Sequence, residues 1–209
     1  MANYSPSCIV VGDFNHDGKS DLAVTAGGSN SDTVAILLGK GDGTFEKALY
    51  YTAGVGAVFL VASDFNHDGN LDLAVASQSN YIAILLGNGD GTFQPATQTP
   101  PVQTFETFVG VGDFNHDGHP DLVALSQNGT ISVLLGNGDG TFQNAIVTNP
   151  SFSVTAIAAG DFNRDGNLDL ATAGSFGSGA SVNILLGNGN GTFQQGASYP
   201  GAPFRPRLQ

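Results

Sequence analysis

The chain contains no tryptophan, one cysteine and only six lysine and arginine residues among its 209 residues. The single Cys8 excludes an intrachain disulfide. The net charge of −12 disfavours nucleic acid as a partner, because nucleic-acid-binding surfaces are basic. The longest apolar run, residues 57–62, is too short to cross a bilayer, so no membrane insertion is expected. Residues 1–11 show no signal peptide, since they lack both a basic segment and an apolar stretch.

Charged residues are also scarce, at 11%, whereas glycine occupies 30 positions. This composition disfavours long exposed helices, which depend on Glu, Lys and Arg, and favours short strands joined by tight turns. The hydrophobic fraction of 41% is ordinary for a folded protein, and the length allows a sizeable core.

Two short sequence patterns each occur four times. The first, Asp-Phe-Asn-x-Asp-Gly-x-x-Asp-Leu, begins at intervals of 51, 49 and 48 residues, at Asp13, Asp64, Asp113 and Asp161. The second, Leu-Leu-Gly-x-Gly-x-Gly-Thr-Phe, ends at Phe45, Phe93, Phe142 and Phe193. We therefore predict a single repeat domain over residues 1–209, with units at approximately 5–52, 53–100, 101–149 and 150–200 and a tail at 201–209.

Each unit contains four segments of strand length. In the first unit they are residues 8–12, 22–25, 33–38 and 45–52, which are apolar or β-branched and bounded by Gly, Asn, Asp or Ser. No segment has the periodicity of a helix. The pattern predicts an all-β fold, a β-propeller of four repeats in which each repeat is a four-stranded antiparallel blade. A β-solenoid is the alternative.

The acidic residues are concentrated in the first pattern. Its four copies contain 12 of the 18 Asp and Glu residues, and the remaining acidic residues balance the lysines and arginines. Three carboxylates within nine residues repel one another, which indicates that each loop binds a cation.

Oxygen-bearing groups stand at positions 1, 3, 5, 7 and 9 of each of these four loops, with the position-7 residue contributing its carbonyl, and glycine follows position 5. All-oxygen ligation with several carboxylates favours Ca²⁺. We expect about four Ca²⁺ ions, one per repeat. The alternative is that these Asp and Asn residues only form turns. The predicted ligands are Asp13, Asn15, Asp17, Lys19 and Asp21; Asp64, Asn66, Asp68, Asn70 and Asp72; Asp113, Asn115, Asp117, His119 and Asp121; and Asp161, Asn163, Asp165, Asn167 and Asp169.

The segment VGDFNHDGKSDLAV, residues 11–24, and its counterparts resemble the FG-GAP/VCBS repeat. This repeat forms the blade of the integrin α-subunit head and of many bacterial extracellular proteins. The resemblance extends from Ser5 to Tyr199. It implies a β-propeller with structural calcium between the first two strands of each blade, and an extracellular or cell-surface location. Family propellers commonly have about seven blades, within the range known for propellers, whereas this chain has four repeats.

Other polar residues of the patterns are given structural interpretations. His16, His67 and His116, with Arg164 in the fourth copy, stand at loop position 4 and are expected to be solvated. Asp42, Asp90 and Asp139 are interpreted as turn formers in the second pattern. No nucleophile lies near a His and an acid in a repeated or clustered arrangement, so no enzymatic activity is predicted.

Segments that differ between repeats are expected to lie on the face opposite the calcium loops. They are residues 27–32, 52–57, 77–80, 98–107, 126–129, 148–153, 176–180 and the tail, and they carry Phe105, Phe108, Phe152 and Phe176. Because recognition is normally located in variable loops, we predict a calcium-stabilised binding, adhesion or assembly module for a protein or glycan ligand. The absence of tryptophan weakens the glycan hypothesis. The alternative is a catalytic or non-catalytic propeller domain of a polysaccharide-active enzyme.

Blades bury both faces against neighbours, so an open arc of four would expose two apolar faces. Three arrangements remain open, namely a strained four-bladed ring, two chains completing an eight-bladed ring, or a piece of a longer array. A homodimer is the favoured expectation.

Overall fold

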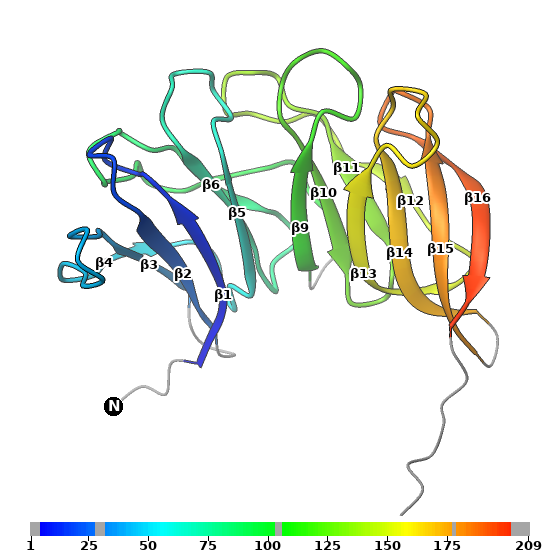
Figure 1. The fold of residues 1–209 in the computed structure, drawn as a ribbon, viewed down its shortest axis with the longest axis horizontal. Helices are drawn as coiled ribbons and strands as arrows, with labels where there is room; N and C mark the ends of the chain where they lie inside the picture. Colours follow the sequence, from blue (N-terminus) through cyan, green and yellow to red (C-terminus); the bar gives the residue numbers. More distant parts are fainter. Residues whose placement is uncertain (1–4, 28–31, 103–105, 177–178, 202–209) are drawn as a thin grey trace, which may run out of the picture.

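The computed structural model describes residues 5–27, 32–102, 106–176 and 179–201. Within these residues, the chain forms four four-stranded antiparallel sheets and no helix (Figure 1). This confirms the predicted all-β class and its organisation into four blades. No helix in the described ranges is long and apolar enough to cross a bilayer.

Each sheet contains four strands in chain order. The first consists of β1 (Ser5–Gly12), β2 (Asp21–Gly27), β3 (Thr33–Leu37) and β4 (Leu49–Thr52). The second consists of β5 (Phe59–Ser63), β6 (Asp72–Ala76), β7 (Ala83–Leu85) and β8 (Thr97–Gln98). The third consists of β9 (Glu106–Gly112), β10 (Asp121–Ser126), β11 (Ile131–Leu134) and β12 (Ile146–Thr148). The fourth consists of β13 (Ser153–Gly160), β14 (Asp169–Phe176), β15 (Gly179–Gly187) and β16 (Phe193–Pro200).

The second strand of a sheet lies at its centre and is apolar on both faces. Every residue of β6 is buried, as expected for a strand between two neighbouring sheets. The ladder between the first two strands ends at Gly12 opposite Asp21, and in the second sheet at Ser63 opposite Asp72. The loop between these strands therefore starts and ends at one point of the sheet edge.

The last strand of three sheets is shorter than predicted. Phe45 forms an isolated bridge with Gly39, and β4 begins only at Leu49. The hairpin is closed by its own backbone bonds, from Lys40 N to Thr44 O and from Glu46 N to Leu38 O. In the fourth sheet, by contrast, β16 begins at Phe193 and continues to Pro200.

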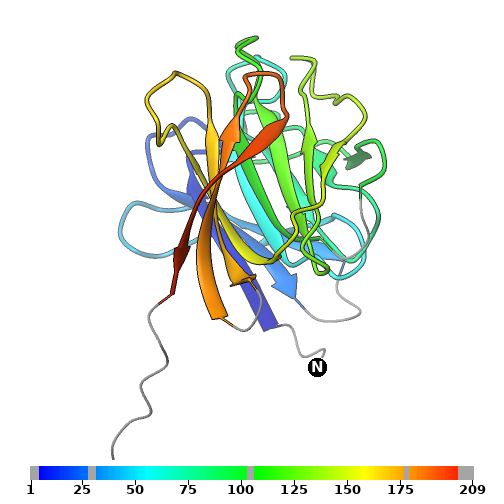
Figure 2. The same ribbon diagram turned by 90° about the vertical axis from the view of Figure 1, so that its right-hand side faces the viewer.

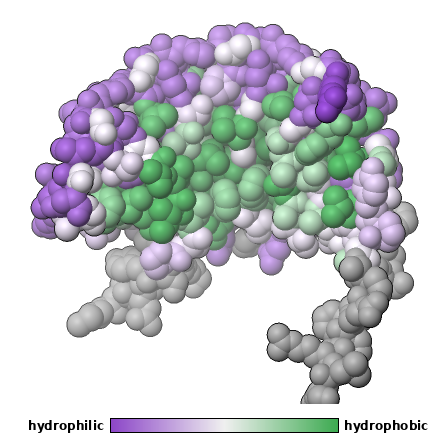
Figure 3. Space-filling view, viewed as in Figure 1, coloured by the Kyte–Doolittle hydropathy of each residue, from purple (hydrophilic) through white to green (hydrophobic). Residues whose placement is uncertain are grey.

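The four sheets are arranged in a row, with the first and fourth at its two ends (Figure 1). Neighbouring sheets contact each other through their first strands, β1 with β5, β5 with β9, and β9 with β13. Figure 2 views the molecule from the side of the fourth sheet. In Figure 3, hydrophilic residues gather over the end of the molecule that carries the polar loops, and hydrophobic residues cover the strands below.

Three hydrophobic clusters lie between successive sheets and form the core. In each one, a phenylalanine of the first pattern meets a phenylalanine of the second pattern in the next sheet. Phe14 contacts Phe93 and Phe65 contacts Phe142, each with 5.6 Å between ring centroids. Phe114 contacts Phe193 at 6.0 Å. The repeating unit is therefore held by contacts with its neighbours, and each interface repeats the previous one.

Candidate metal-binding loops

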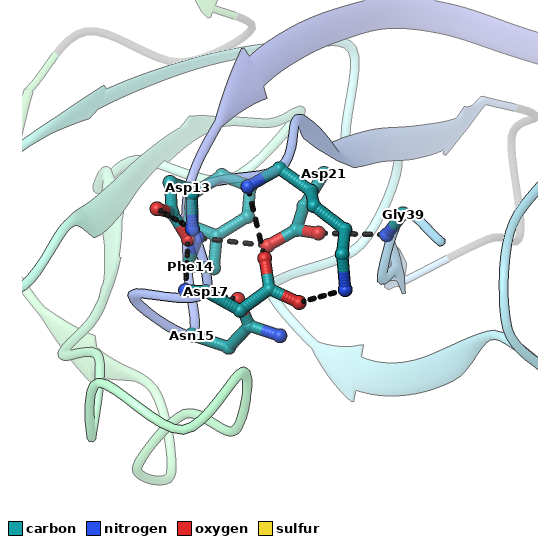
Figure 4. Close-up of polar contacts among 8 residues, drawn as sticks. Asp13, Phe14, Asn15, Asp17, Asp21 and Gly39 are labelled. Carbon is teal, nitrogen blue, oxygen red and sulfur yellow. Dashed lines mark hydrogen bonds and ion pairs between the residues drawn. The ribbon is translucent and has the colours of Figure 1, made fainter. Parts of the chain in front are cut away.

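The loop between β1 and β2 gathers its polar side chains around the backbone of Asp17 (Figure 4). The Asp17 N–H donates to Asp13 Oδ1 and to Asn15 Oδ1, at 3.2 Å each. The Gly18 N–H donates to Asp13 Oδ2 at 2.9 Å. Gly18 has a φ of 78°, a left-handed conformation that glycine adopts readily. The residues at positions 1, 3 and 5 are thus brought together, with glycine at the sharp turn.

The same arrangement occurs in the other sheets. In the second, the Asp68 N–H donates to Asp64 Oδ1 and Asn66 Oδ1, both at 3.1 Å. In the fourth, Asp161 and Asn163 accept from the Asp165 N–H at 3.2 and 3.0 Å. In the third, Asn115 Oδ1 accepts from the Asp117 N–H at 3.2 Å, and Asp113 Oδ2 accepts from Gly118 N at 3.1 Å.

The aspartate at position 9 is fully buried in every sheet and has a role that the sequence analysis missed. Asp72 Oδ2 accepts from the Phe65 N–H and Asp72 Oδ1 from the Gly87 N–H, at 2.8 Å each. Asp21, Asp121 and Asp169 accept equivalent pairs of bonds. One carboxylate thus fastens the start of the loop to the β3–β4 hairpin or its counterpart. The apolar strand that follows could have indicated this, because a buried carboxylate needs donors.

The second oxygen of the position-5 aspartate has two kinds of partner. Asp17 Oδ2 forms an ion pair with Lys19 Nζ at 2.9 Å. This hydrogen bond from the ammonium lowers the pKa of Asp17. In the other three loops, the side-chain amide of the position-3 asparagine donates to this oxygen. The position-5 aspartate is therefore paired with a lysine in the first loop and with an asparagine amide in the other three.

Two of the buried aspartates differ electrostatically from the exposed ones. Burial raises the pKa of Asp72 and of Asp121 to about 6, and neighbouring loop carboxylates act in the same direction. In the exposed part of the fourth loop, the backbone N–H of Asn167 lowers the pKa of Asp165 by hydrogen bonding. Each loop therefore combines a carboxylate inside the sheet with carboxylates at the surface.

One feature of the third loop fits a hard cation such as Ca²⁺. Asp113 Oδ1 is buried, and no group in the described ranges donates a hydrogen bond to it. An oxygen of this kind needs a partner, and a cation would supply one. However, no three His, Cys, Asp or Glu side chains in the described ranges are gathered into a ready metal cluster. The position-9 carboxylates are directed to backbone amides, as described above. Positions 1, 3 and 5 are the ligands that the geometry brings together, and binding itself stays a prediction.

The position-4 histidines are exposed, as expected, and each one also contacts the neighbouring loop. His16 Nε2 lies 2.9 Å from Asn70 Oδ1, and His116 Nε2 lies 2.8 Å from Asn167 Oδ1. His67 Nε2 lies 2.8 Å from His119 Nδ1. Each histidine has a φ between 57° and 62°, which points its side chain toward position 7 of the next loop. Sequence spacing alone gives no indication of a contact across about fifty residues.

The second pattern forms turns, as predicted. Asp42 Oδ1 accepts from Thr44 N and from Thr44 Oγ1, at 2.9 and 2.6 Å. Asp90, Asp139 and Asn190 do the same in the other sheets. The turns also contact the preceding sheet, since the Gly91 N–H donates to Phe14 O at 2.9 Å. The loops of the first pattern and the turns of the second therefore share one end of the molecule, as expected.

Two of the phenylalanines assigned to the variable loops, Phe108 and Phe152, pack against other residues instead of forming an exposed surface. Phe152 is buried, and the Phe108 ring packs on Phe59 with 4.8 Å between centroids. Phe176 belongs to strand β14, and Phe105 lies outside the described residues. The predicted segments 27–32 and 98–107 and the tail also lie partly outside them. Phe108 and Phe152 stabilise sheet contacts, because apolar rings near a sheet edge are buried by the next sheet.

Comparison with known proteins identifies the repeat. The sequence profile of the FG-GAP-like repeat matches residues 13–75, 64–124 and 113–172, which together span residues 13–172. The chain belongs to the FG-GAP-like repeat family. No curated protein matches this FG-GAP chain.

Solved structures show the same fold. A crystal structure of BBS1N in complex with ARL6DN, soaked with mercury, is similar with a TM-score of 0.59 and 19% identity over 92% of this chain and 56% of that chain. The same complex soaked with lead gives a TM-score of 0.55 and 14% identity over 88% of this chain and 53% of that chain. The FG-GAP chain thus spans about half the length of these structures.

Proposed function

We propose that the FG-GAP chain is a calcium-stabilised interaction module that binds a protein partner. It would bind four Ca²⁺ ions, one in each loop of the first pattern. The observation that carries the calcium assignment is the buried Asp113 Oδ1 without a hydrogen-bond donor, in a loop that holds three carboxylates. The role assigned to the chain is binding, with no catalytic step.

The ion would be held mainly by the residues at positions 1, 3 and 5 of each loop. Calcium supplies the positive charge that offsets three neighbouring carboxylates. In the first loop, the Lys19 ammonium on Asp17 supplies part of this charge. Flexible oxygen sites of this kind, with modest affinity, suit the high calcium concentration outside cells. We therefore propose an extracellular or cell-surface location.

A protein partner is supported by the division of the molecule into a repeated end and a variable end. The calcium loops and turns repeat almost unchanged, whereas the loops at the opposite end differ in length and sequence. Val55 on this variable end is 56% exposed, and Gln78, whose N–H donates to Val55 O, is exposed beside it. Gln127 and Asn128 are exposed in the third sheet's loop. BBS1N, which is similar in fold, is seen in complex with ARL6DN.

A specific groove favours a glycan as a second ligand class. A cavity of about 440 Å³ lies between the outer strands of the first two sheets and is lined by Tyr50, Tyr51, Tyr81 and Gln98, among others. The Phe93 N–H donates to the Tyr51 hydroxyl at 3.2 Å, which holds that side chain in place. Tyrosine rings beside amide and hydroxyl groups are suited to the apolar and polar faces of a sugar. On a glycan array, Tyr50→Ala should abolish any signal that the wild-type protein gives.

Calorimetric titration with Ca²⁺ tests the metal assignment. We expect about four equivalents for the wild-type protein and about one fewer for Asp68→Ala, which removes a position-5 carboxylate. Asp90→Ala is the matched control, because Asp90 is an exposed aspartate in a turn of the same sheet. It should leave the stoichiometry unchanged. Equal losses for both variants, or no heat for the wild type, would exclude the loops as calcium sites.

The protein partner is tested with the calcium-loaded chain immobilised as bait. A protein that binds the wild type and Asp90→Ala, but not the double variant Val55→Asp, Asn128→Arg, would support recognition by the variable end. A partner that binds all three equally would place recognition elsewhere.

A further inference from the structure

The two outer faces of the row of sheets match the halves of an interface that the molecule already contains three times. We call the face of each sheet that contacts the next sheet its trailing face, and the face that contacts the preceding sheet its leading face. In the first interface, Phe14 and Val34 are trailing residues, and Leu60 and Phe93 are leading residues. Among the described residues, no further sheet contacts the trailing face of the fourth sheet. The leading face of the first sheet likewise has no neighbouring sheet among them.

The trailing face of the fourth sheet is exposed at positions that are buried elsewhere. Phe162 is 51% exposed, whereas its equivalents Phe14, Phe65 and Phe114 are 2–3% exposed. Val182 is 42% exposed, whereas its equivalents Val34, Ile82 and Ile131 are fully buried. Because the sequence pattern is the same at each place, the difference comes from the missing neighbour and not from the residues.

The leading face of the first sheet shows the complementary difference. Ile9 is 59% exposed, whereas its equivalents Leu60, Val109 and Ile157 are at most 8% exposed. Gly43 is exposed and a Cβ there would meet nothing within 4 Å, whereas the equivalent Gly91 is covered by Leu38 of the preceding sheet. On its leading face, the first sheet therefore exposes the Ile9 side chain and the turn at Gly43.

The shapes of the two faces fit each other. A shallow, almost wholly apolar hollow of about 230 Å³ lies on the fourth sheet, lined by Ala156, Ala158, Ala171, Ala173 and Val182, among others. The hollow is lined by small side chains. In the internal interfaces, the aliphatic residue of the next first strand, namely Leu60, Val109 or Ile157, is part of the buried cluster between the sheets. Ile9 is the corresponding aliphatic residue in the first sheet.

The charged residues that the two faces carry in their loops are complementary, with one exception. In the internal interfaces, a histidine at position 4 faces position 7 of the next loop and also the position-5 aspartate, as His16 does with Asp68. Arg164 stands at position 4 of the fourth loop, so its equivalent partners would be Asp17 and Lys19 of a first loop. The attraction to Asp17 favours the contact, and the repulsion from Lys19 opposes it.

We propose that two copies of this chain associate head to tail, with the trailing face of each fourth sheet against the leading face of the partner's first sheet. In the proposed pair, the two interfaces are identical and related by a twofold axis, since each copy contributes one face of each kind. It goes beyond the proposed function and does not require a ligand on the variable end.

The internal interfaces specify the contacts that this pairing forms. Phe162 packs edge-on against Phe45 of the other copy, as Phe14 does against Phe93. The Gly43 N–H donates to Phe162 O, as the Gly91 N–H does to Phe14 O. Ile9 enters the alanine-lined hollow, and Arg164 contacts Asp17.

Light scattering of the calcium-loaded 209-residue chain tests the association, and we expect about twice the monomer mass of 21.3 kDa. Ile9→Asp and Phe162→Asp should each give a monomer. Both residues are exposed in a single copy, so both variants should fold, which circular dichroism verifies. Val55→Asp is the matched control, since Val55 is 56% exposed but lies on neither face, and it should leave the dimer intact. A monomeric wild type, or a dimer that survives both substitutions, would overturn the proposal.

Mixing the two monomeric variants distinguishes head-to-tail pairing from other modes. Ile9→Asp retains an intact trailing face and Phe162→Asp an intact leading face, so a mixture contains one unaltered interface and should form a heterodimer. Failure of the mixture to associate would exclude head-to-tail pairing.

The register is tested by Lys19→Asn, which restores the residue found at Asn70 and Asn167. Removing the repulsion from Arg164 should tighten each interface by up to about fivefold, since surface charge pairs are worth up to about 1 kcal/mol. An unchanged or weaker dimer would show that Arg164 does not face the first loop.

Discussion

Phe14 meets Phe93 edge-on across the boundary between the first and second sheets, with 5.6 Å between the ring centroids. The first ring comes from the start of a polar loop and the second from a turn about eighty residues later. The same pair recurs at the next two boundaries. In the first three loops, one phenylalanine thus anchors the loop to the core, next to the carboxylates that are proposed to bind calcium.

The burial of these rings predicts unequal effects of the same substitution. Phe114→Ala should lower the free energy of unfolding by about 3–5 kcal/mol, because it leaves a cavity in a buried cluster. Phe162→Ala should cost less than about 1 kcal/mol, because that ring is half exposed. Urea denaturation measures the free energy of unfolding of both variants. The protein concentration should be low enough to separate any dimer. Equal losses would mean that the fourth sheet is covered in a single copy.

Removal of calcium should destabilise the fold. Ligand that binds only the folded state stabilises it by about 2.7 kcal/mol per site at a hundredfold excess over Kd. Excess chelator should therefore lower the melting temperature, and added Ca²⁺ should restore it, whereas Mg²⁺ should restore less. A melting curve that does not respond to chelator would contradict structural calcium sites.

The two kinds of loop aspartate should differ when calcium is absent. Asp121→Ala leaves the buried N–H groups of Phe114 and Gly136 without their acceptor, and should cost about 2–4 kcal/mol even in chelator. Asp117→Ala removes an exposed carboxylate and should cost little in chelator, but should reduce the stabilisation by Ca²⁺. Unfolding of both variants, measured with and without calcium, tests this. If chelator made the two variants equally stable, the backbone role of position 9 would be refuted.

Asp72 and Asp121 should titrate anomalously in the calcium-free protein. Burial raises their pKa from 3.8 to about 6, so the folded state holds the proton more tightly than the unfolded state. Each group then contributes stability that is fully present below pH 3.8 and is lost as the pH rises through about 6. Calcium should lower both pKa values, because a nearby cation favours the carboxylate.

Carbon-13 NMR titration of the aspartate carboxyl groups measures this directly. Asp90 is the internal control, since the hydrogen bond from the Thr92 hydroxyl lowers its pKa below 3.8. Titration of Asp72 and Asp121 at or below the ordinary value in chelator would contradict the burial argument.

The sequence by itself determined the features that depend on neighbouring residues. Four copies of two patterns predicted four sheets, and glycine after position 5 predicted the sharp turn at Gly18. The gathering of Asp13 and Asn15 around Asp17 is equally local, because alternate side chains in a tight loop point to one side. The Thr44 turn on Asp42 was predicted for the same reason.

The tertiary structure decided everything that depends on a neighbouring strand or sheet. Asp72 is fastened by the N–H of Gly87, fifteen residues away, and His16 by Asn70 in the next sheet. Phe114 and Phe162 stand in identical sequence patterns, yet one is buried and the other half exposed. The local sequence cannot distinguish them, because the burial of a blade face is a property of the sheet beside it.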